Sequence, residues 1–264
     1  MRALVTGVAS GIGRATCLRL ARDGRNEGEA VKIAAVDLAA SPALDEAVRE
    51  MRDAGAEVFA LHGDMGSTDD PARVVGEAVA RLGGLDALVS NAGINRPRAL
   101  VDYSVEDWDR VFAVNTRATW LLAKAAHPAL AASRGALVAV ASMSGTNAHA
   151  GLGAYGPSKA AVIMLARVLA QELGRDGIRV NTVSPGMVRT GMTAAVYADK
   201  QVAAERDDLV PLGRVATPED IADVIVFLLG PDARYVSGHD LVVDGGITGN
   251  LLGRIPGISR ITRA

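Results

Sequence analysis

Residues 3–23 read A-L-V-T-G-V-A-S-G-I-G-R-A-T-C-L-R-L-A-R-D. The run begins with a short, apolar, β-leaning segment, residues 3–6. A turn with glycines at positions 7, 11 and 13 follows, and residues 12–23 then have a helical pattern. The stretch therefore predicts a strand, a glycine-rich turn and a helix in direct succession, which is the first unit of an α/β fold.

The alternation of short apolar runs and helical stretches continues to the end of the sheet. We expect strands at residues 3–6, 31–36, 58–62, 85–89, 136–141, 178–183 and 241–243. We expect helices at residues 12–23, 42–54, 71–82, 105–132, 154–174 and 217–229, the last with Thr217 as N-cap, Pro218 at its first position and Asp220 at its third. The strands are continuous apolar runs, which indicates a sheet that is buried on both faces.

These elements predict one doubly wound, Rossmann-type α/β domain over residues 1–246, with a mostly parallel seven-stranded sheet and helices on both faces. Residues 25–30 are interpreted as a solvated loop, and residues 187–212 as a looser segment. Residues 247–264 form a C-terminal extension, for which a flexible tail and an arm packed on another subunit both remain open.

Composition excludes several classes of protein. The chain has 264 residues, 49% of them hydrophobic, and a formal net charge of −2 without a basic block, so no nucleic-acid partner is expected. Cys17 is the single cysteine, so there is no disulfide framework, and the four scattered histidines predict no metal site. No apolar run is long enough for a membrane helix and no signal peptide is visible, so we expect a cytoplasmic protein without a membrane partner.

The turn after the first strand is suited to a dinucleotide. A pyrophosphate needs free backbone N–H groups at a helix N-terminus and no side chains in the way, and glycines supply these conditions. The spacing is G-x-x-x-G-x-G. Other segments that end strands at the same edge are expected to contact the cofactor, because ligands of open α/β sheets bind beyond the carboxyl ends of the strands. The predicted cofactor-binding residues of these segments are Gly7, Ser10, Gly11, Ile12, Gly13, Asp64, Met65, Asn91, Ala92, Gly93, Pro185, Gly186 and Val188.

Asp37 closes the second predicted strand, about 24 residues after Gly13. A carboxylate at this place can accept hydrogen bonds from the ribose hydroxyls of the adenosine and would repel a 2′-phosphate. Ser10 and Leu38 offer no charge to such a phosphate. The sequence therefore favours NAD over NADP.

Tyr155 and Lys159 are four residues apart, so they share one face of the predicted helix. Pairs at this spacing are common on solvated helices and are not in themselves a site. An ammonium beside a phenol lowers its pKa, which would make Tyr155 a proton-transfer group near neutral pH. Ser142 follows the preceding strand and can present its hydroxyl to the same region.

Taken together, these motifs resemble those of the short-chain dehydrogenase/reductase family. The resemblance runs from Leu4 to about Gly246 and rests on T-G-V-A-S-G-I-G, N-A-G at residues 91–93, the asparagine of F-A-V-N-T, Ser142, Y-G-P-S-K, the P-G at 185–186 and V-D-G-G at 243–246. It implies a catalytic tetrad of Asn115, Ser142, Tyr155 and Lys159.

The resemblance also implies a role for each residue. Tyr155 would be the general acid or base. Lys159 would lower its pKa and bind the nicotinamide ribose, and Ser142 would orient the substrate oxygen. Asn115 would hold a water that links Lys159 to solvent, and Thr190 would contact the nicotinamide amide.

Substrate choice is expected to come from an adaptable apolar wall and two polar groups, for which the candidates are Met143, Asn147, His149, Met187 and Met192. The expected substrate is a small alcohol or ketone, and the family resemblance implies a homotetramer. Three hypotheses stay open: an NAD-dependent alcohol dehydrogenase, an NADPH-dependent ketoreductase of the 3-oxoacyl reductase type, and a dinucleotide-binding regulatory protein without turnover.

Overall fold

The computed structural model describes residues 1–28 and 30–250. Within these residues, seven strands form one sheet in the order β3-β2-β1-β4-β5-β6-β7, and every neighbouring pair is parallel. The strands are β1 (Arg2–Thr6), β2 (Lys32–Asp37), β3 (Glu57–His62), β4 (Ala87–Ser90), β5 (Ala136–Val140), β6 (Arg179–Pro185) and β7 (Asp240–Val243). The predicted doubly wound α/β fold is confirmed.

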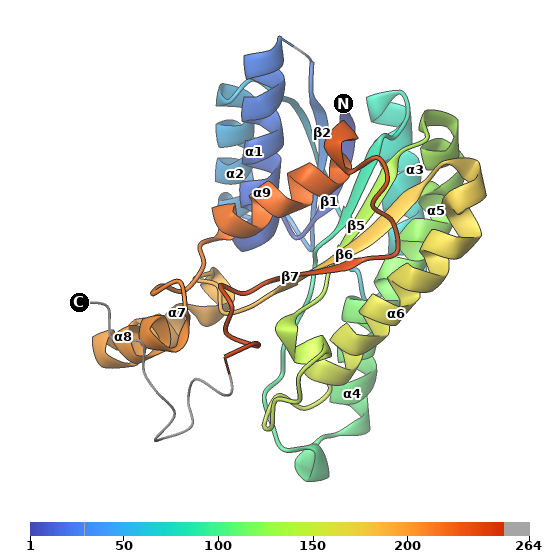
Figure 1. Ribbon diagram of the computed structural model, residues 1–264. Coiled ribbons are helices and arrows are strands. Elements are labelled where there is room, and N and C mark those ends of the chain that lie inside the picture. Colours follow the sequence, from blue (N-terminus) through green and yellow to red (C-terminus); the bar gives the residue numbers. More distant parts are fainter. Residues whose placement is uncertain (29, 251–264) are drawn as a thin grey trace.

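Helices cover both faces of the sheet (Figure 1). One face carries α1 (Gly11–Glu27), α2 (Pro42–Asp53) and α9 (Pro218–Leu229), and the other carries α3 (Asp70–Leu82), α5 (Ala118–Ser133) and α6 (Tyr155–Leu173). The remaining helices are α4 (Val105–Phe112), α7 (Ala194–Tyr197) and α8 (Lys200–Leu209). Short 3₁₀ turns are η1 (Leu100–Asp102), η3 (Met143–Gly145), η4 (Gly174–Asp176), η5 (Gly191–Thr193) and η6 (Pro231–Ala233), and η2 (Ala113–Arg117) is a π turn.

Two hydrophobic cores lie on opposite faces of the sheet. Side chains alternate along a strand, so Ala3 and Val5 of β1 point into the core beneath α1 and α9, while Leu4 points into the core beneath α3, α5 and α6. Full burial of a leucine such as Leu4 stabilises the fold by about 2 kcal/mol. This two-sided burial is why the strands read as unbroken apolar runs.

Several helices begin as the sequence predicts. The Ser41 hydroxyl accepts a hydrogen bond from the Leu44 N–H at the start of α2. Thr217 and Asp220 form a capping box at the start of α9, in which the Asp220 carboxylate accepts the Thr217 N–H at 2.7 Å. Each such cap stabilises its helix by about 1 kcal/mol, since it satisfies an amide that has no intrahelical partner.

Two expectations need correction. Residues 25–27 are not loop but the last residues of α1, which ends before Gly28 at φ 70°. The segment 187–212 contains α7 and α8, the latter capped by the Asp199 carboxylate. The long helical region expected over residues 105–132 is confirmed, and it contains a π turn at 113–117 between α4 and α5. Residues 251–264 of the predicted extension lie outside the described residues, and no described helix is long and apolar enough to span a bilayer.

Candidate active site

The carboxyl ends of the strands surround a cavity of about 450 Å³. This is within the range of roughly 300–1,000 Å³ that is usual for small-molecule sites. The predicted residues that line it are Gly7, Ser10, Gly11, Ile12, Asp37, Asp64, Met65, Asn91, Ala92, Gly93, Ser142, Tyr155, Lys159, Pro185, Gly186, Val188 and Thr190. Residues that are up to 183 positions apart in the sequence are thus brought together at one sheet edge, as expected.

The glycine-rich turn forms one wall of the cavity. Gly7 and Gly11 have φ values of 71° and 58°, a conformation that other residues rarely adopt. Because α1 begins at Gly11, the N–H groups of its first turn have no intrahelical partner and are available to an anion. Gly13 does not line the cavity. A Cβ at Gly13 would overlap the Gly7 carbonyl, so this predicted cofactor-binding residue serves helix–strand packing.

The end of β4 holds this turn in place. The Asn91 side-chain amide donates to the carbonyl oxygens of Thr6 (2.8 Å) and Gly7 (3.1 Å). The Thr6 hydroxyl accepts the N–H groups of both Asn91 and Ala92 at 3.0 Å. The N-A-G motif therefore fixes the glycine turn through its side chain and lines the cavity beside it.

Asp37 presents its carboxylate at the end of β2. Its Oδ2 atom accepts the Ala9 N–H and its Oδ1 atom accepts the Leu38 N–H, both at 2.8 Å. Each oxygen keeps a further acceptor position, which suits a pair of ribose hydroxyls. Arg14, in the first turn of α1, is bound to Glu50 at 2.7 Å. Its charge is therefore already compensated.

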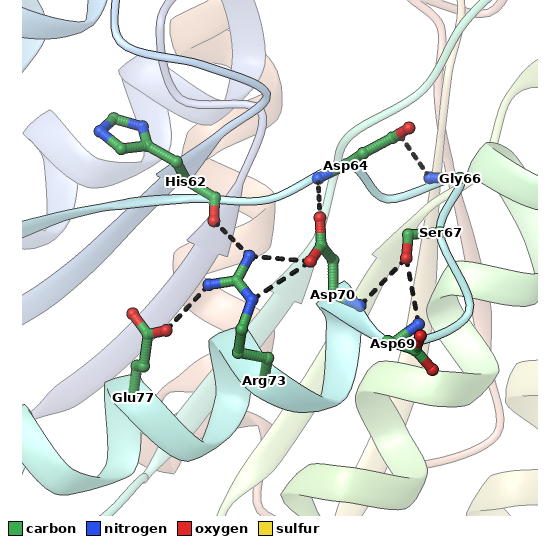
Figure 2. A network of polar contacts seen from close by, with 8 residues as sticks. All are labelled: His62, Asp64, Gly66, Ser67, Asp69, Asp70, Arg73 and Glu77. Carbon is green, nitrogen blue, oxygen red and sulfur yellow. Dashed lines mark hydrogen bonds and ion pairs between the residues drawn. The ribbon is translucent and has the colours of Figure 1, made fainter.

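A network of polar contacts fixes the turn after β3 (Figure 2). The Asp64 N–H donates to the Asp70 carboxylate at 2.8 Å, and the Gly66 N–H donates to Asp64 Oδ1 at 2.7 Å. The Arg110 guanidinium binds both oxygens of Asp64, at 2.9 and 3.0 Å, and this hydrogen-bonded pair holds the pKa of Asp64 below its usual range. Asp64 and Met65 face the cavity from this turn.

Tyr155, the first residue of α6, lies at the other end of the cavity with Ser142. Burial raises the pKa of Tyr155, and a hydrogen bond with Ser142 opposes the rise. The Ser142 hydroxyl also accepts the Ser144 N–H at 3.1 Å, which orients it. The pKa of Tyr155 in this structure is therefore raised and not lowered, because desolvation outweighs the contact with Ser142. The lowering expected from the Lys159 ammonium stays a prediction.

Lys159 is almost fully buried one turn along α6. Its ammonium donates to the Val140 carbonyl at 2.7 Å and lies 5.7 Å from the centre of the Tyr155 ring. Burial lowers the pKa of Lys159 to about 8. The amine therefore lies close to the Tyr155 side chain in a buried environment that disfavours its protonated form.

Asn115 lies behind the cavity, in the π turn. Its Oδ1 atom accepts the Ile94 N–H at 2.9 Å, and its amide donates to the Ile94 carbonyl and to the Ser158 hydroxyl at 3.0 Å. The water expected between Asn115 and Lys159 stays a prediction. Gly93 allows the two to approach, since a Cβ there would lie 3.3 Å from Asn115 Oδ1 and 3.4 Å from Lys159 Nζ.

Thr190 closes the cavity opposite the glycine turn. Its N–H donates to the Thr193 hydroxyl at 3.0 Å, and a Cβ at Gly11 would lie 3.4 Å from its side chain. The Thr193 hydroxyl in turn donates to the Val188 carbonyl at 2.8 Å. The segment after β6 is therefore held against the cavity by its own hydrogen bonds.

Among the described side chains, those expected to determine substrate choice do not line the cavity as most of the cofactor-binding and catalytic candidates do. Met143, Asn147, His149 and Met187 do not line the cavity, and the side chain of Met192 lies outside the described part of the chain. Asn147 is exposed and donates to the Met143 carbonyl at 3.2 Å. His149 Nδ1 is 3.4 Å from the Ser144 hydroxyl, two residues from Ser142.

Several cavity or supporting residues were not among the predicted site residues, and four of them carry polar or packing contacts of the site. Ile94, Arg110 and Thr193 line the cavity, and Ser158 is buried between Asn115 and the Tyr155 carbonyl, to which it donates at 2.7 Å. For Ile94, Ser158 and Thr193 the available signal was a position next to a predicted residue, whereas Arg110 lies five residues from Asn115 and gave no such signal. Among the described residues, no cluster of histidine, cysteine and carboxylate side chains could hold a metal ion.

Comparisons with known proteins agree with this geometry. Residues 7–248 match the family model described as enoyl-(acyl carrier protein) reductase. The chain is 39% identical to a (3R)-3-hydroxyacyl-CoA dehydrogenase of Mus musculus, over 93% of this chain and 95% of the relative, and 40% identical to a cis-4-hydroxycyclohexanecarboxylate dehydrogenase of Sinomonas cyclohexanicum, over 93% and 96%.

Solved structures of other proteins also resemble this chain over nearly its whole length. One is a short-chain type dehydrogenase/reductase from Mycobacterium marinum, with a TM-score of 0.84 and 32% identity, covering 94% of this chain and 95% of the other. A second, described as an NAD(P)-dependent gluconate 5-dehydrogenase from Beutenbergia cavernae with bound NADP at low occupancy, has a TM-score of 0.84 and 36% identity over 94% and 96%. With the sheet order, the glycine turn and the Tyr155–Lys159 pair in one cavity, these matches establish that the chain belongs to the short-chain dehydrogenase/reductase family.

Proposed function

We propose that this chain is an NAD(H)-dependent oxidoreductase that interconverts a secondary alcohol and a ketone, with Tyr155 as the general acid and base. The observation that carries the proposal is that the hydroxyls of Tyr155 and Ser142 share one cavity with the free N–H groups at the start of α1. The residues fit a nicotinamide dinucleotide because the positive φ of Gly7 and Gly11 leaves a backbone cradle without side chains. When bound, that cofactor supplies or accepts the hydride.

The proton chemistry follows from the side chains. With a raised pKa, Tyr155 holds its proton at neutral pH and can donate it to a ketone oxygen during reduction. Ser142 contacts Tyr155 and can donate its hydroxyl proton to the same oxygen, which stabilises the developing negative charge. Lys159, with a pKa of about 8, carries positive charge at pH 7 near the Tyr155 ring and favours the phenolate that remains.

Cofactor preference is proposed to follow from charge. Asp37 places a carboxylate at the adenosine end of the cavity, where it would repel a 2′-phosphate. Of the described residues that line the cavity, the cationic ones are Arg110 and Lys159, and Arg110 is bound to Asp64. These observations support NAD. The alternative is an NADPH-dependent ketoreductase, which the solved relative with bound NADP keeps in view.

The named activities of the relatives support a substrate with a CH–OH group. Those relatives include dehydrogenases of 3-hydroxyacyl-CoA, of cis-4-hydroxycyclohexanecarboxylate and of cyclopentanol. The family model carries the name of an enoyl reductase. Enoyl reductases commonly have a wider spacing between the tyrosine and the lysine than the four residues from Tyr155 to Lys159. The motif Y-G-P-S-K therefore favours an alcohol or ketone substrate over an enoyl substrate.

A Tyr155→Phe variant tests the proposal most directly. Turnover of a panel of 3-hydroxyacyl-CoA, cyclic and linear secondary alcohols should fall by at least about 10²-fold, because the proton-transfer group is lost. The affinity for NADH, measured by fluorescence titration, should stay within about twofold. Tyr235→Phe, at a fully exposed tyrosine, is the matched control and should leave both quantities unchanged. Normal turnover by Tyr155→Phe would refute the assignment.

An Asp37→Ala variant tests the cofactor. The wild type should bind NADH more tightly than NADPH, and the substitution should narrow that gap by about tenfold, since one repulsive charge is removed. A wild type that already prefers NADPH would show that the alternative is correct. A wild type that binds both dinucleotides without any turnover would favour the regulatory hypothesis.

The proposed assembly is a homotetramer. Three large apolar side chains on α5 and α6 remain exposed, which supports burial by another subunit: Trp120 (45%), Met164 (56%) and Val168 (44%). Light scattering coupled to size-exclusion chromatography gives the oligomeric state, and a Met164→Glu variant should shift it towards smaller species.

A further inference from the structure

We propose that Arg110 is a positioning residue for the adenine end of the dinucleotide, which it serves by fixing the carboxylate of Asp64. The inference rests on the proposed function, because it presumes that a dinucleotide occupies the cavity. Arg110 lies on α4, 46 residues from Asp64, and the two side chains meet where Asp64 lines the cavity. Both oxygens of Asp64 are bound by the same guanidinium, at 2.9 and 3.0 Å.

Three hydrogen bonds hold the backbone of the turn that carries Asp64. Asp70 accepts its N–H at 2.8 Å, and the same carboxylate binds Arg73 on the outer side of the turn (Figure 2). The Gly66 N–H donates to Asp64 Oδ1, and the Gly66 carbonyl accepts a hydrogen bond from the Arg117 guanidinium. Two arginines of one continuous helical segment therefore hold this short turn.

The number of hydrogen bonds decides what Asp64 can still bind. An ionised carboxylate has about four acceptor positions. Oδ1 uses two of them, for the Gly66 N–H and one Arg110 N–H, and Oδ2 uses one, for the other Arg110 N–H. One position on Oδ2 is left, and the side chain is still 36% exposed. A fixed acceptor with a single open position suits one N–H donor, such as the exocyclic amino group of adenine.

Gly66 makes room for this arrangement. A Cβ at position 66 would overlap Nη1 of Arg110, so a side chain there would require the guanidinium to shift from its present position on Asp64. The pair also compensates its own charge, because Arg110 offsets Asp64. Asp37 differs from Asp64: in the described residues, the hydrogen bonds given for its carboxylate come from the backbone N–H groups of Ala9 and Leu38.

The test separates the two ends of the cofactor. Isothermal titration gives the Kd for ADP-ribose, which carries the adenine, and for reduced nicotinamide mononucleotide, which lacks it. Arg110→Ala should raise the Kd for ADP-ribose about tenfold, because Asp64 becomes free to rotate and an unpaired charge faces the cavity. The Kd for the mononucleotide should stay within twofold. With saturating NADH, kcat should be unchanged while KM for NADH rises.

Arg214→Ala is the matched control. Arg214 forms an equally bidentate pair with Asp220, at 2.6 and 2.7 Å, away from the cavity. Its loss should lower the melting temperature without altering either Kd. Arg110→Lys keeps the positive charge but loses the planar guanidinium that binds both oxygens of Asp64. This variant should therefore bind ADP-ribose more tightly than Arg110→Ala and less tightly than the wild type.

A double-mutant cycle identifies the route of the effect. In an Asp64→Asn background, Arg110→Ala should have no further effect on ADP-ribose if Arg110 acts through Asp64. An additive loss, an unchanged Kd for ADP-ribose, or an equal loss for the mononucleotide would each overturn the inference. A wild type that binds neither NADH nor ADP-ribose would instead overturn the proposed function.

Discussion

Lys159→Met should make the unliganded protein more stable at pH 7 while removing its activity. The pKa of Lys159 falls from 10.5 to about 8 because the ammonium is buried. The difference of about 2.5 units corresponds to about 3 kcal/mol that the charged form costs the folded state. Methionine has a similar shape and carries no charge, so this cost disappears.

A loss partly offsets that gain. Lys159 donates to the Val140 carbonyl at 2.7 Å, and removal of this donor costs about 1–2 kcal/mol. The net expectation is a free energy of unfolding that is about 1–2 kcal/mol higher than that of the wild type at pH 7. A buried charge kept at such a cost is typical of a functional site rather than of a stabilising one.

The pH dependence has a defined sign. Because the pKa of Lys159 is lower in the folded than in the unfolded chain, the unfolded chain binds more protons between about pH 8 and 10.5. The wild type therefore gains relative stability as the pH rises through that window. The cost is fully present below pH 8 and falls to about 1 kcal/mol at pH 10. The advantage of Lys159→Met should then vanish or reverse.

Urea denaturation of both proteins at pH 7 and pH 10, without cofactor, measures these differences. Lys124→Met, at an exposed position on α5, is the control and should change the free energy of unfolding by less than about 0.5 kcal/mol at both values. The reasoning would be refuted by a Lys159→Met variant that is less stable than the wild type at pH 7, or by a difference that is the same at pH 7 and pH 10.

Three further substitutions test a helix cap and two close contacts of glycine residues. Asp220→Asn should lower the free energy of unfolding by about 1 kcal/mol at pH 7. The difference from the wild type should disappear between pH 4 and 2, because the pKa of Asp220 is about 2 in the folded chain and 3.8 ordinarily. A difference that does not change with pH would contradict this prediction. Gly153→Ala should lower the melting temperature, since its Cβ would overlap the Tyr103 ring at a residue with φ 54°, and adding Tyr103→Ala should restore part of the loss. Gly13→Ala should prevent stable folding, because its Cβ would overlap the Gly7 carbonyl; a soluble variant with normal melting would be inconsistent with that packing.

The strands and the sheet could be predicted because their determinants are local. A run such as A-L-V-T is buried on both faces, so its apolar pattern is unbroken, and the turn residues that follow mark its end. The gathering of Asp37, Asn91 and Tyr155 at one edge then follows from topology, since all parallel strands end there. Cap residues such as Thr217 were equally legible.

Other features depend on contacts that no local pattern records. The π turn that carries Asn115 adds a residue to one helical turn without changing composition, so the segment reads as ordinary helix. The polar run at residues 25–27 predicts a solvated loop, whereas these residues continue α1 up to Gly28. Met143 and Met187 were natural candidates for an apolar wall, but neither lines the cavity.

The ionisation of Tyr155 illustrates the limit most clearly. The spacing of Tyr155 and Lys159 correctly predicts that they are neighbours, and a nearby ammonium lowers the pKa of a phenol in water. Burial acts on both groups at once: it raises the pKa of the phenol and lowers that of the amine, so each resists the charged form that the pair would need. The unliganded site is therefore arranged to keep the proton on Tyr155. A shift towards phenolate requires added positive charge or added hydrogen bonds at this end of the cavity. The contact with Ser142 is one such hydrogen bond, since it already opposes the rise in the pKa of Tyr155.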